Sequence, residues 1–266
     1  MKIPSEGGGL LPTNSGINNK GGEFIVSIIT VTKRKHFCEN VFNNYKRQRY
    51  KDKELIIILN DDAMDIDNWR KKAQESENVR VFQLENSITL GECYNFAIPK
   101  AKYEYIAKFD DDDYYSPYYL EEAMKGLQVS GADMIGKSTI FIYYLSNQVL
   151  TLFNEKKEFI ELYREEELYE KYLVGATFVF KKEIFPNVMF EKVNDGEDTL
   201  FLKACLNRGF KLFSTSKYNY VYIRYPNIHH HTSTFQEHKL FPKSIALKRI
   251  NNFQEYVECS PKDIFK

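Results

Sequence analysis

Four consecutive aspartates, Asp110–Asp113, are the strongest chemical signal in the sequence. Close carboxylates repel one another by about 1 kcal/mol per pair even in bulk water. Because alternate side chains of a strand share a face, Asp110 and Asp112 are expected to point one way and their two neighbours the other. Two carboxylates on one side suit a hard divalent cation, which would bring the phosphates of a nucleotide to the site. The alternative is a solvated acidic turn that precedes a helix.

A second acidic element, Gly196-Glu197-Asp198, opens a predicted helix at 196–209. The partial positive charge at a helix N-terminus helps to keep a carboxylate ionised. An ionised carboxylate that faces a substrate hydroxyl can act as a general base. Acidic residues are also common in first helical turns for structural reasons, so this pattern alone leaves both roles open.

The third element is RYPNIHHHTS at 224–233, which begins at Arg224 and contains three adjacent histidines. One or two of these histidines could bind a metal ion or contact phosphate, with Arg224 or Ser233 alongside. The alternative is a polar loop with exposed histidines. The chain contains no HExxH pattern, which argues against a zinc hydrolase.

Apolar runs in the first half predict the strands that position these groups. They lie at 24–32, 54–59, 79–84 and 103–109, with helical patterns between them. Continuous apolar strands separated by helices predict an α/β fold with a parallel sheet covered on both faces. Ligands bind beyond the carboxyl ends of such strands. Those ends carry Thr30-Val31-Thr32, Asn60-Asp61-Asp62 and the four aspartates.

The second half and the two ends of the chain are less regular. Strand-like segments at 134–153 and 175–180 enclose a charged stretch at 161–172 that reads as a helix. From Pro242 onward, Leu247, Ile250, Phe253 and Val257 recur at helical spacing and predict an amphipathic terminal helix. We expect this helix to dock on the domain or to form a homodimer contact, and peripheral membrane contact is the alternative. Residues 1–22 are rich in Gly, Asn and Ser and predict a flexible leader.

The bulk composition excludes several classes of partner. Lys plus Arg and Asp plus Glu number 37 each, so no global charge attracts nucleic acid or an anionic membrane. The 4 cysteines form no CxxC or Cys/His zinc spacing, which favours free thiols in a reducing, cytoplasmic compartment. The apolar stretch FIVSIITV is too short for a signal peptide or a membrane span, so no transmembrane segment is expected.

Four segments, taken in order, resemble family 2 glycosyltransferases of the GT-A fold. They are VSIITVTKRKHFCENVFNNYKRQRYKDKELIIILNDD, LGECYNFAIPKAKYEYIAKFDDDDYYSPYYLEEAM, GATFVFKKEIF and GEDTLFLKACLNRGFKLF. The resemblance implies a Rossmann-like, mostly parallel sheet and a smaller, mixed acceptor half. It also implies inverting transfer of a sugar from a nucleotide-sugar, usually a UDP-sugar, to a carbohydrate or other hydroxyl acceptor. The motifs are further similar to those of glycosyltransferases of spore-coat or spore-maturation type.

The same resemblance assigns roles to individual residues. Asp198 matches the catalytic base of the family, with Glu197 beside it. A Mn²⁺ or Mg²⁺ ion is expected at the DxD motif, held by Asp110, Asp112 and His231, with Asp113 as a further participant. Thr30 and Thr32 line the nucleoside pocket, and Asn60 or Asp61 contacts the uracil. The complete nucleotide-binding set is Thr30, Thr32, Asn60, Asp61, Gly91, Asn95, Lys108, Asp110, Asp111 and Arg224.

Departures from the family pattern bear on the donor contacts. The family often has Arg-Asn where this chain has Tyr94-Asn95, and Asp-Asp-Gly-Ser where it has Asn-Asp-Asp-Ala. The sequence also bears on two alternative functions. A sugar nucleotidyltransferase would show a glycine-rich basic loop after the first strand, and TKRK has no glycine. A non-catalytic nucleotide-sugar-binding or scaffolding module would be favoured by a broken DxD motif or a missing Asp198.

The predicted domain layout is a flexible leader at 1–22, a GT-A domain at 23–235 and a C-terminal helical extension at 236–266. Within the GT-A domain, the nucleotide-binding half is expected at about 23–130 and the acceptor half at about 131–235.

Overall fold

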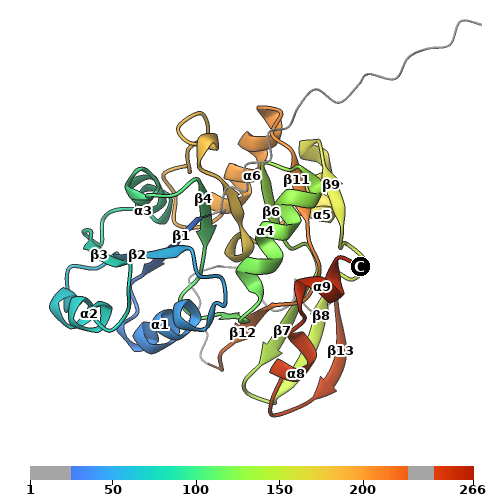
Figure 1. Cartoon of the computed structure of the whole chain (residues 1–266), viewed down its shortest axis with the longest axis horizontal. Helices are drawn as coiled ribbons and strands as arrows, with labels where there is room; N and C mark the ends of the chain where they lie inside the picture. Colours follow the sequence, from blue (N-terminus) through green and yellow to red (C-terminus); the bar gives the residue numbers. More distant parts are fainter. Residues whose placement is uncertain (1–24, 227–242) are drawn as a thin grey trace, which may run out of the picture.

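The computed structural model describes residues 25–226 and 243–266, whose central feature is an eight-stranded sheet (Figure 1). Its strand order is β3-β2-β1-β4-β10-β6-β11-β9. β1, β2, β3 and β4 pair in parallel, as do β6 and β11, whereas β9 and β10 are antiparallel to their neighbours. The predicted mostly parallel sheet is therefore confirmed. The strands are β1 (Val26–Thr32), β2 (Lys53–Leu59), β3 (Val79–Gln83), β4 (Tyr105–Lys108), β6 (Met134–Gly136), β9 (Ile160–Leu162), β10 (Val179–Lys181) and β11 (Leu212–Ser214).

Helices cover both faces of this sheet because its central strands are apolar on both sides. In β2, Leu55 and Ile57 pack with α1, α2 and α4, whereas Ile56 and Ile58 pack with α3 and α6 on the opposite face. This alternation follows from the two-residue period of a strand. The helices are α1 (Cys38–Arg47), α2 (Ile66–Ala73), α3 (Leu90–Ala97), α4 (Tyr119–Ser130) and α6 (Glu197–Asn207). The predicted α/β architecture is confirmed, and none of the helices described is long and apolar enough to cross a membrane.

A second, five-stranded sheet forms the smaller half, with the order β13-β8-β7-β12-β5 (Figure 1). β5 begins directly after the four aspartates, so this sheet is joined to the first at the predicted site. Buried residues of β7, β8 and β12 form its own apolar cluster. The strands are β5 (Tyr114–Tyr115), β7 (Ile140–Tyr144), β8 (Val149–Phe153), β12 (Tyr220–Arg224) and β13 (Ser244–Arg249).

The predicted amphipathic terminal helix is wrong. Residues 244–249 form β13, which pairs antiparallel with β8 and leaves Leu247 48% exposed. Only two short helices follow, α8 (Gln254–Val257) and α9 (Pro261–Ile264). The apparent helical period came from Phe253 and Val257, which instead pack into the apolar cluster of the second sheet. Pairing with the open edge of β8 thus prevails over local periodicity, and the homodimer contact expected through this helix loses its basis.

The charged stretch at 161–172 also differs from expectation. It starts as the end of β9, which pairs with β11, and its helical part is limited to a 3-10 turn at Glu165–Glu167 and the one-turn helix α5 (Leu168–Lys171). The backbone bonds to an edge strand compete successfully with the helical propensity of a segment this short. The predicted leader at 1–22 lies outside the described residues.

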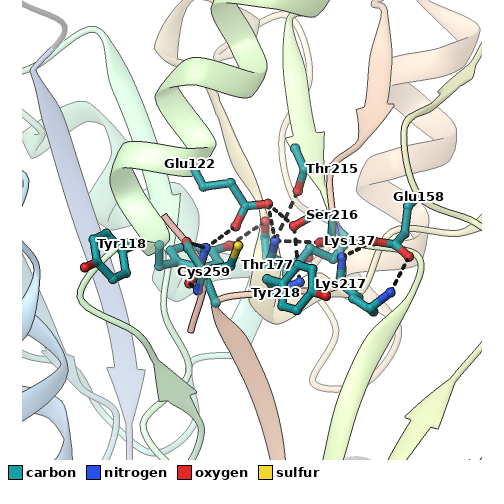
Figure 2. Close-up of polar contacts among 12 residues, drawn as sticks. Tyr118, Glu122, Lys137, Glu158, Thr177, Thr215, Ser216, Lys217, Tyr218 and Cys259 are labelled. Carbon is teal, nitrogen blue, oxygen red and sulfur yellow. Dashed lines mark hydrogen bonds and ion pairs between the residues drawn. The ribbon is translucent and has the colours of Figure 1, made fainter. Parts of the chain in front are cut away.

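A buried polar network joins the two halves (Figure 2). Lys137, just after β6, donates hydrogen bonds to Glu122 Oε1 on α4 at 2.8 Å and to the Ser216 carbonyl at 2.7 Å. Asn219 donates to Glu122 Oε2 and to the Cys259 carbonyl, each at 2.8 Å. Through these contacts α4, the second sheet and the C-terminal segment share one hydrogen-bonded core.

Candidate active site

The four aspartates form a loop between β4 and β5, at the carboxyl edge of the parallel strands. The expectation that Asp111 and Asp112 point to opposite sides is wrong. Both carboxylates bind the same guanidinium, that of Arg34, with Arg34 Nη1 2.9 Å from Asp112 Oδ2. Asp113 turns away and binds Tyr220 and the Ile223 amide. Because the loop has no strand conformation, strand alternation does not apply to it.

The loop backbone is held by side chains of neighbouring elements. Asn40 of α1 donates to the carbonyls of Asp111 and Asp113 at 2.8 and 3.0 Å. The Asp110 amide donates to Tyr115 Oη at 2.8 Å, and the same hydroxyl donates to the Ala176 carbonyl at 2.7 Å. These bonds fix the loop from α1 and from the second sheet, so the carboxylates have defined positions before any ligand binds.

Lys108 connects the aspartate loop to the start of α6. Its ammonium lies 3.4 Å from Asp110 Oδ1 and 3.5 Å from Glu197 Oε1. The Lys108 side chain is only 5% exposed, and its ammonium lies 5.2 Å from the centre of the Tyr94 ring. Burial alone would lower the pKa of Lys108, but Asp110 and the other negative groups raise it well above its usual value, so this residue is a fixed positive charge. The two predicted acidic elements therefore meet at one buried cation.

Asp198 stands beside this contact in a restricted position. Its Oδ1 accepts a hydrogen bond from the Thr199 amide at 2.6 Å. The side chain also lies against the α-carbon of Gly175, where a β-carbon would come within 2.7 Å of Asp198 Cβ. The preceding Gly196 has φ = 81°, a left-handed conformation that favours glycine, and it lets the chain turn into α6. The half-buried Asp198 carboxylate is thus held close to Lys108 and Glu197.

The charges of the loop are incompletely compensated. Burial and the neighbouring Asp111 carboxylate together raise the pKa of Asp112 to about 7, although Arg34 acts in the opposite direction. Burial also raises the pKa values of Asp111 and Asp113. A further cation would therefore be stabilised at this loop.

The donor set determines which cation fits. Within 25–226 and 243–266, no three His, Cys, Asp or Glu side chains are grouped so that they could hold a metal ion by themselves. Carboxylate oxygens of Asp110 and Asp112 suit Mg²⁺ or Mn²⁺, and such ions commonly share their coordination with substrate phosphates. The residues present therefore fit a divalent cation that binds together with a diphosphate. His231, the third predicted ligand, lies outside the described residues, as does Ser233.

The predicted nucleoside residues lie at the ends of β1 and β2. Thr30 is buried, and Thr32 donates a hydrogen bond to Asp111. The Asn60 side chain donates to the carbonyls of Glu85 and Ile88, both at 3.0 Å, and so supports the loop that leads to α3. Asp61 is half-buried, and its Oδ1 accepts from the Ala63 amide at 2.8 Å. The Asn60 amide nitrogen is thus used in structural contacts, and Asp61 remains the prediction for the residue that contacts the base.

Two other predicted nucleotide residues have structural contacts. The Asn95 side chain donates to the Phe190 carbonyl at 2.8 Å and accepts from the Phe190 amide at 2.9 Å. A β-carbon on Gly91 would collide with the Glu191 carbonyl group, whose carbon would be only 2.9 Å away. Both residues therefore fasten α3 to the 190–193 segment.

Arg224 ends β12 and is buried, with its Nη1 donating to Tyr222 Oη at 3.1 Å. The next residue, Tyr225, donates from its hydroxyl to the Asp112 carbonyl at 3.1 Å. The described part of the third predicted element, residues 224–226, thus reaches the aspartate loop through Tyr225.

The profile described as Glycosyl transferase family 2 matches residues 27–189. The chain belongs to this family. It is 30% identical over 141 residues to the O-antigen biosynthesis glycosyltransferase WbnJ of Escherichia coli, in an alignment that covers 52% of this chain and 51% of WbnJ. The chain thus spans about half the length of this curated relative.

Solved structures show the same fold at low identity. S. aureus TarS 1–349 in complex with UDP-GlcNAc gives a TM-score of 0.64 at 18% identity, covering 77% of this chain and 60% of that one. The mannosyltransferase PcManGT of Pyrobaculum calidifontis, in complex with GDP-Man and Mn²⁺, gives a TM-score of 0.54 at 15% identity, covering 75% of this chain and 56% of that one. These likenesses confirm the predicted GT-A fold.

The structure also brings to the candidate site residues that the sequence does not single out. Arg34 was noted only as part of a basic run, although its place directly after β1 was a usable signal. The sequence predicts Gly175 as the first residue of a strand, but it belongs to a helical turn at Gly175–Thr177. Tyr94 was noted as a departure from the family pattern, and it covers Lys108.

Proposed function

We propose that this chain is a metal-dependent, inverting glycosyltransferase that moves a sugar from a nucleotide-sugar, most readily a UDP-sugar, to an acceptor hydroxyl. The observation that carries the proposal is the buried Lys108 contact with both Asp110 and Glu197. It brings the aspartate loop and the start of α6 together at the carboxyl edge of the parallel sheet, where such sheets bind ligands. Family membership supports the same conclusion.

Asp198 is the proposed general base. Its carboxylate accepts the proton of the acceptor hydroxyl while the oxygen attacks the anomeric carbon from the face opposite the nucleotide. Inversion follows from this single displacement. The Thr199 amide and the Gly175 α-carbon restrict the carboxylate, so little reorganisation is needed before attack.

Lys108 and Glu197 are the proposed positioning pair for this base. Because Lys108 holds a positive charge between Asp110 and Glu197, it fixes the distance between the donor side and the acceptor side of the site. Asp110 and Asp112 would hold the Mn²⁺ or Mg²⁺ ion. When bound, that ion would supply positive charge that neutralises the departing nucleoside diphosphate.

Calorimetry with UDP in the presence and absence of Mn²⁺ tests the nucleotide and metal parts of the proposal. The expected result is UDP binding that strengthens markedly with Mn²⁺. Donor hydrolysis across a panel of UDP- and GDP-sugars then tests catalysis. Absence of metal-dependent UDP binding would contradict the proposal, and tight UDP binding with no turnover of any donor would favour the non-catalytic module instead.

A further inference from the structure

The cation that pairs with Asp111 and Asp112 is a side chain of the protein itself. Arg34 Nη1 binds Asp112 Oδ2 at 2.9 Å, and Arg34 Nη2 and Nε bind the two oxygens of Asp111, the Nε contact at 3.2 Å. Asp112 is one of the two carboxylates that the proposed function assigns to the divalent cation. The arginine and the metal ion would therefore share a ligand.

The surroundings of Arg34 restrict how it can move. Its guanidinium lies 4.7 Å from the centre of the Phe37 ring, and Phe37 packs edge-on against Tyr225 at 5.2 Å. The Arg34 amide donates to Thr32 Oγ1 at 3.0 Å, and the same hydroxyl donates to Asp111. The backbone and the Asp111 end of the contact are thus fixed. The bond from Nη1 to Asp112 can open while these contacts at the end of β1 persist.

Asp111 and Asp112 differ in their other hydrogen-bond partners and in their exposure to solvent. Asp111 is 2% exposed and also accepts a hydrogen bond from Thr32, so its partners are all internal. Asp112 has a 9% exposed side chain, whereas the side chain of Asp110 is 36% exposed. A cation that arrives from solvent therefore meets Asp110 first and Asp112 second.

We propose that Arg34 is a donor-binding residue that exchanges partners: it stays on Asp111, releases Asp112 when the divalent cation binds, and presents the freed Nη1 to a diphosphate oxygen of the donor. This inference rests on the proposed function. Its chemistry is the preference of guanidinium for carboxylate and phosphate oxygens alike. If Asp112 is released and no phosphate is present, Nη1 loses its contact with this carboxylate and gains none from a donor. The metal ion and the nucleotide therefore bind as a pair, and the metal ion alone binds weakly.

Mn²⁺ binding in the absence of nucleotide, followed by electron paramagnetic resonance, tests the exchange on purified wild-type protein and on Arg34→Gln. We expect Arg34→Gln to bind Mn²⁺ about tenfold more tightly, because a hydrogen bond to a charged group no longer competes. In the presence of Mn²⁺, UDP affinity measured by calorimetry should fall about tenfold in the same variant, because a charged contact to the diphosphate is lost. Lys35→Gln removes the same charge from an exposed position one residue away and should change neither value.

Loss of Arg34 leaves Asp111 buried without its partner, so Arg34→Gln could unfold. The double variant Arg34→Gln/Asp111→Asn removes both members of that pair and keeps Asp110 and Asp112, and it should show the same tighter Mn²⁺ binding. Equal Mn²⁺ affinity in wild type and these variants would overturn the exchange, whatever UDP does. Tighter Mn²⁺ binding with unchanged UDP affinity would overturn the contact to the diphosphate. A wild-type protein that binds no UDP contradicts the proposed function, and the nucleotide-free comparison still decides on Arg34.

Discussion

The carboxylate of Asp198 lies directly against the α-carbon of Gly175. A β-carbon at position 175 would come within 2.7 Å of Asp198 Cβ, which no rotation of the carboxylate alone relieves. Any side chain at this position must therefore displace the proposed base.

Gly175→Ala should lower sugar transfer while UDP affinity in the presence of Mn²⁺ stays unchanged. A displacement of about 1 Å at a reacting group can cost roughly 100-fold in rate. The measurement is kcat for transfer beside calorimetry with UDP. Gly209→Ala is the control, because φ = 82° makes it strained but open space surrounds it and it lies at the far end of α6. If both variants reduce transfer equally, the effect is one of stability and not of base position.

Asp198→Asn should keep the shape of the site and abolish its basicity. General base catalysis contributes roughly 100- to 10,000-fold, and transfer should fall by that factor with UDP affinity retained. Asp112→Ala should show the opposite effect on nucleotide binding, because loss of a proposed metal ligand should weaken Mn²⁺-dependent UDP binding. Normal transfer by Asp198→Asn would place the base on another residue.

Removal of Lys108 should destabilise the protein because two carboxylates lose their shared cation. Breaking one side of a buried pair costs about 3–5 kcal/mol, and urea unfolding of Lys108→Met should show a loss of that order. Lys108→Met/Glu197→Gln should recover much of the loss, because Glu197 is buried whereas Asp110 is 36% exposed and water can solvate it. A double variant as unstable as the single one would show that packing, not charge, explains the effect.

The architecture was predictable from sequence where periodicity and burial agree. The apolar runs that became β1, β2 and β4 are buried on both faces, so their composition alone indicated a parallel sheet. The terminal segment was not predictable from its own sequence. The strand β13 depends on backbone bonds to β8, which lies far earlier in the chain. Local spacing contains no information about such a partner.

Sequence motifs point to the acidic residues of the candidate site but not to their contacts. The positions of Asp110, Asp112 and Asp198 followed from motifs at element ends. The side-chain directions did not, because a loop between strands has no fixed period, and one guanidinium gathered Asp111 and Asp112 together. Gly175 is the clearest miss, since only the fold reveals that the side chain of Asp198 covers its α-carbon.

The thiols of Cys93 and Cys205 should resist alkylation in the folded protein. Burial raises the pKa of each to about 12, from 9.0. Since the folded value is the higher one, these thiols stabilise the fold fully below pH 9 and lose that contribution as the pH rises toward 12. Iodoacetamide labelling between pH 7 and 9, read by mass spectrometry, should modify the half-buried Cys38 and Cys259 before the two buried thiols. Labelling of Cys93 at the rate of Cys259 would contradict this burial.

The Glu122–Lys137 pair in Figure 2 should be the most sensitive point of the junction between the two halves. Its side chains are 1% and 2% exposed, so Lys137→Met leaves a buried carboxylate without its cation and should cost about 3–5 kcal/mol in urea unfolding. The exposed pair Lys46–Glu75, at 3.5 Å, is the control, and Lys46→Met should cost at most about 1 kcal/mol.

The same substitution should loosen the C-terminal segment. Asn219 binds both Glu122 and the Cys259 carbonyl, so a shift of Glu122 is transmitted to α8 and α9. Hydrogen exchange over residues 253–266 should therefore accelerate in Lys137→Met and stay unchanged in Lys46→Met. Uniform acceleration across the whole chain would mean that Lys137 stabilises the fold globally and has no particular link to the C-terminus.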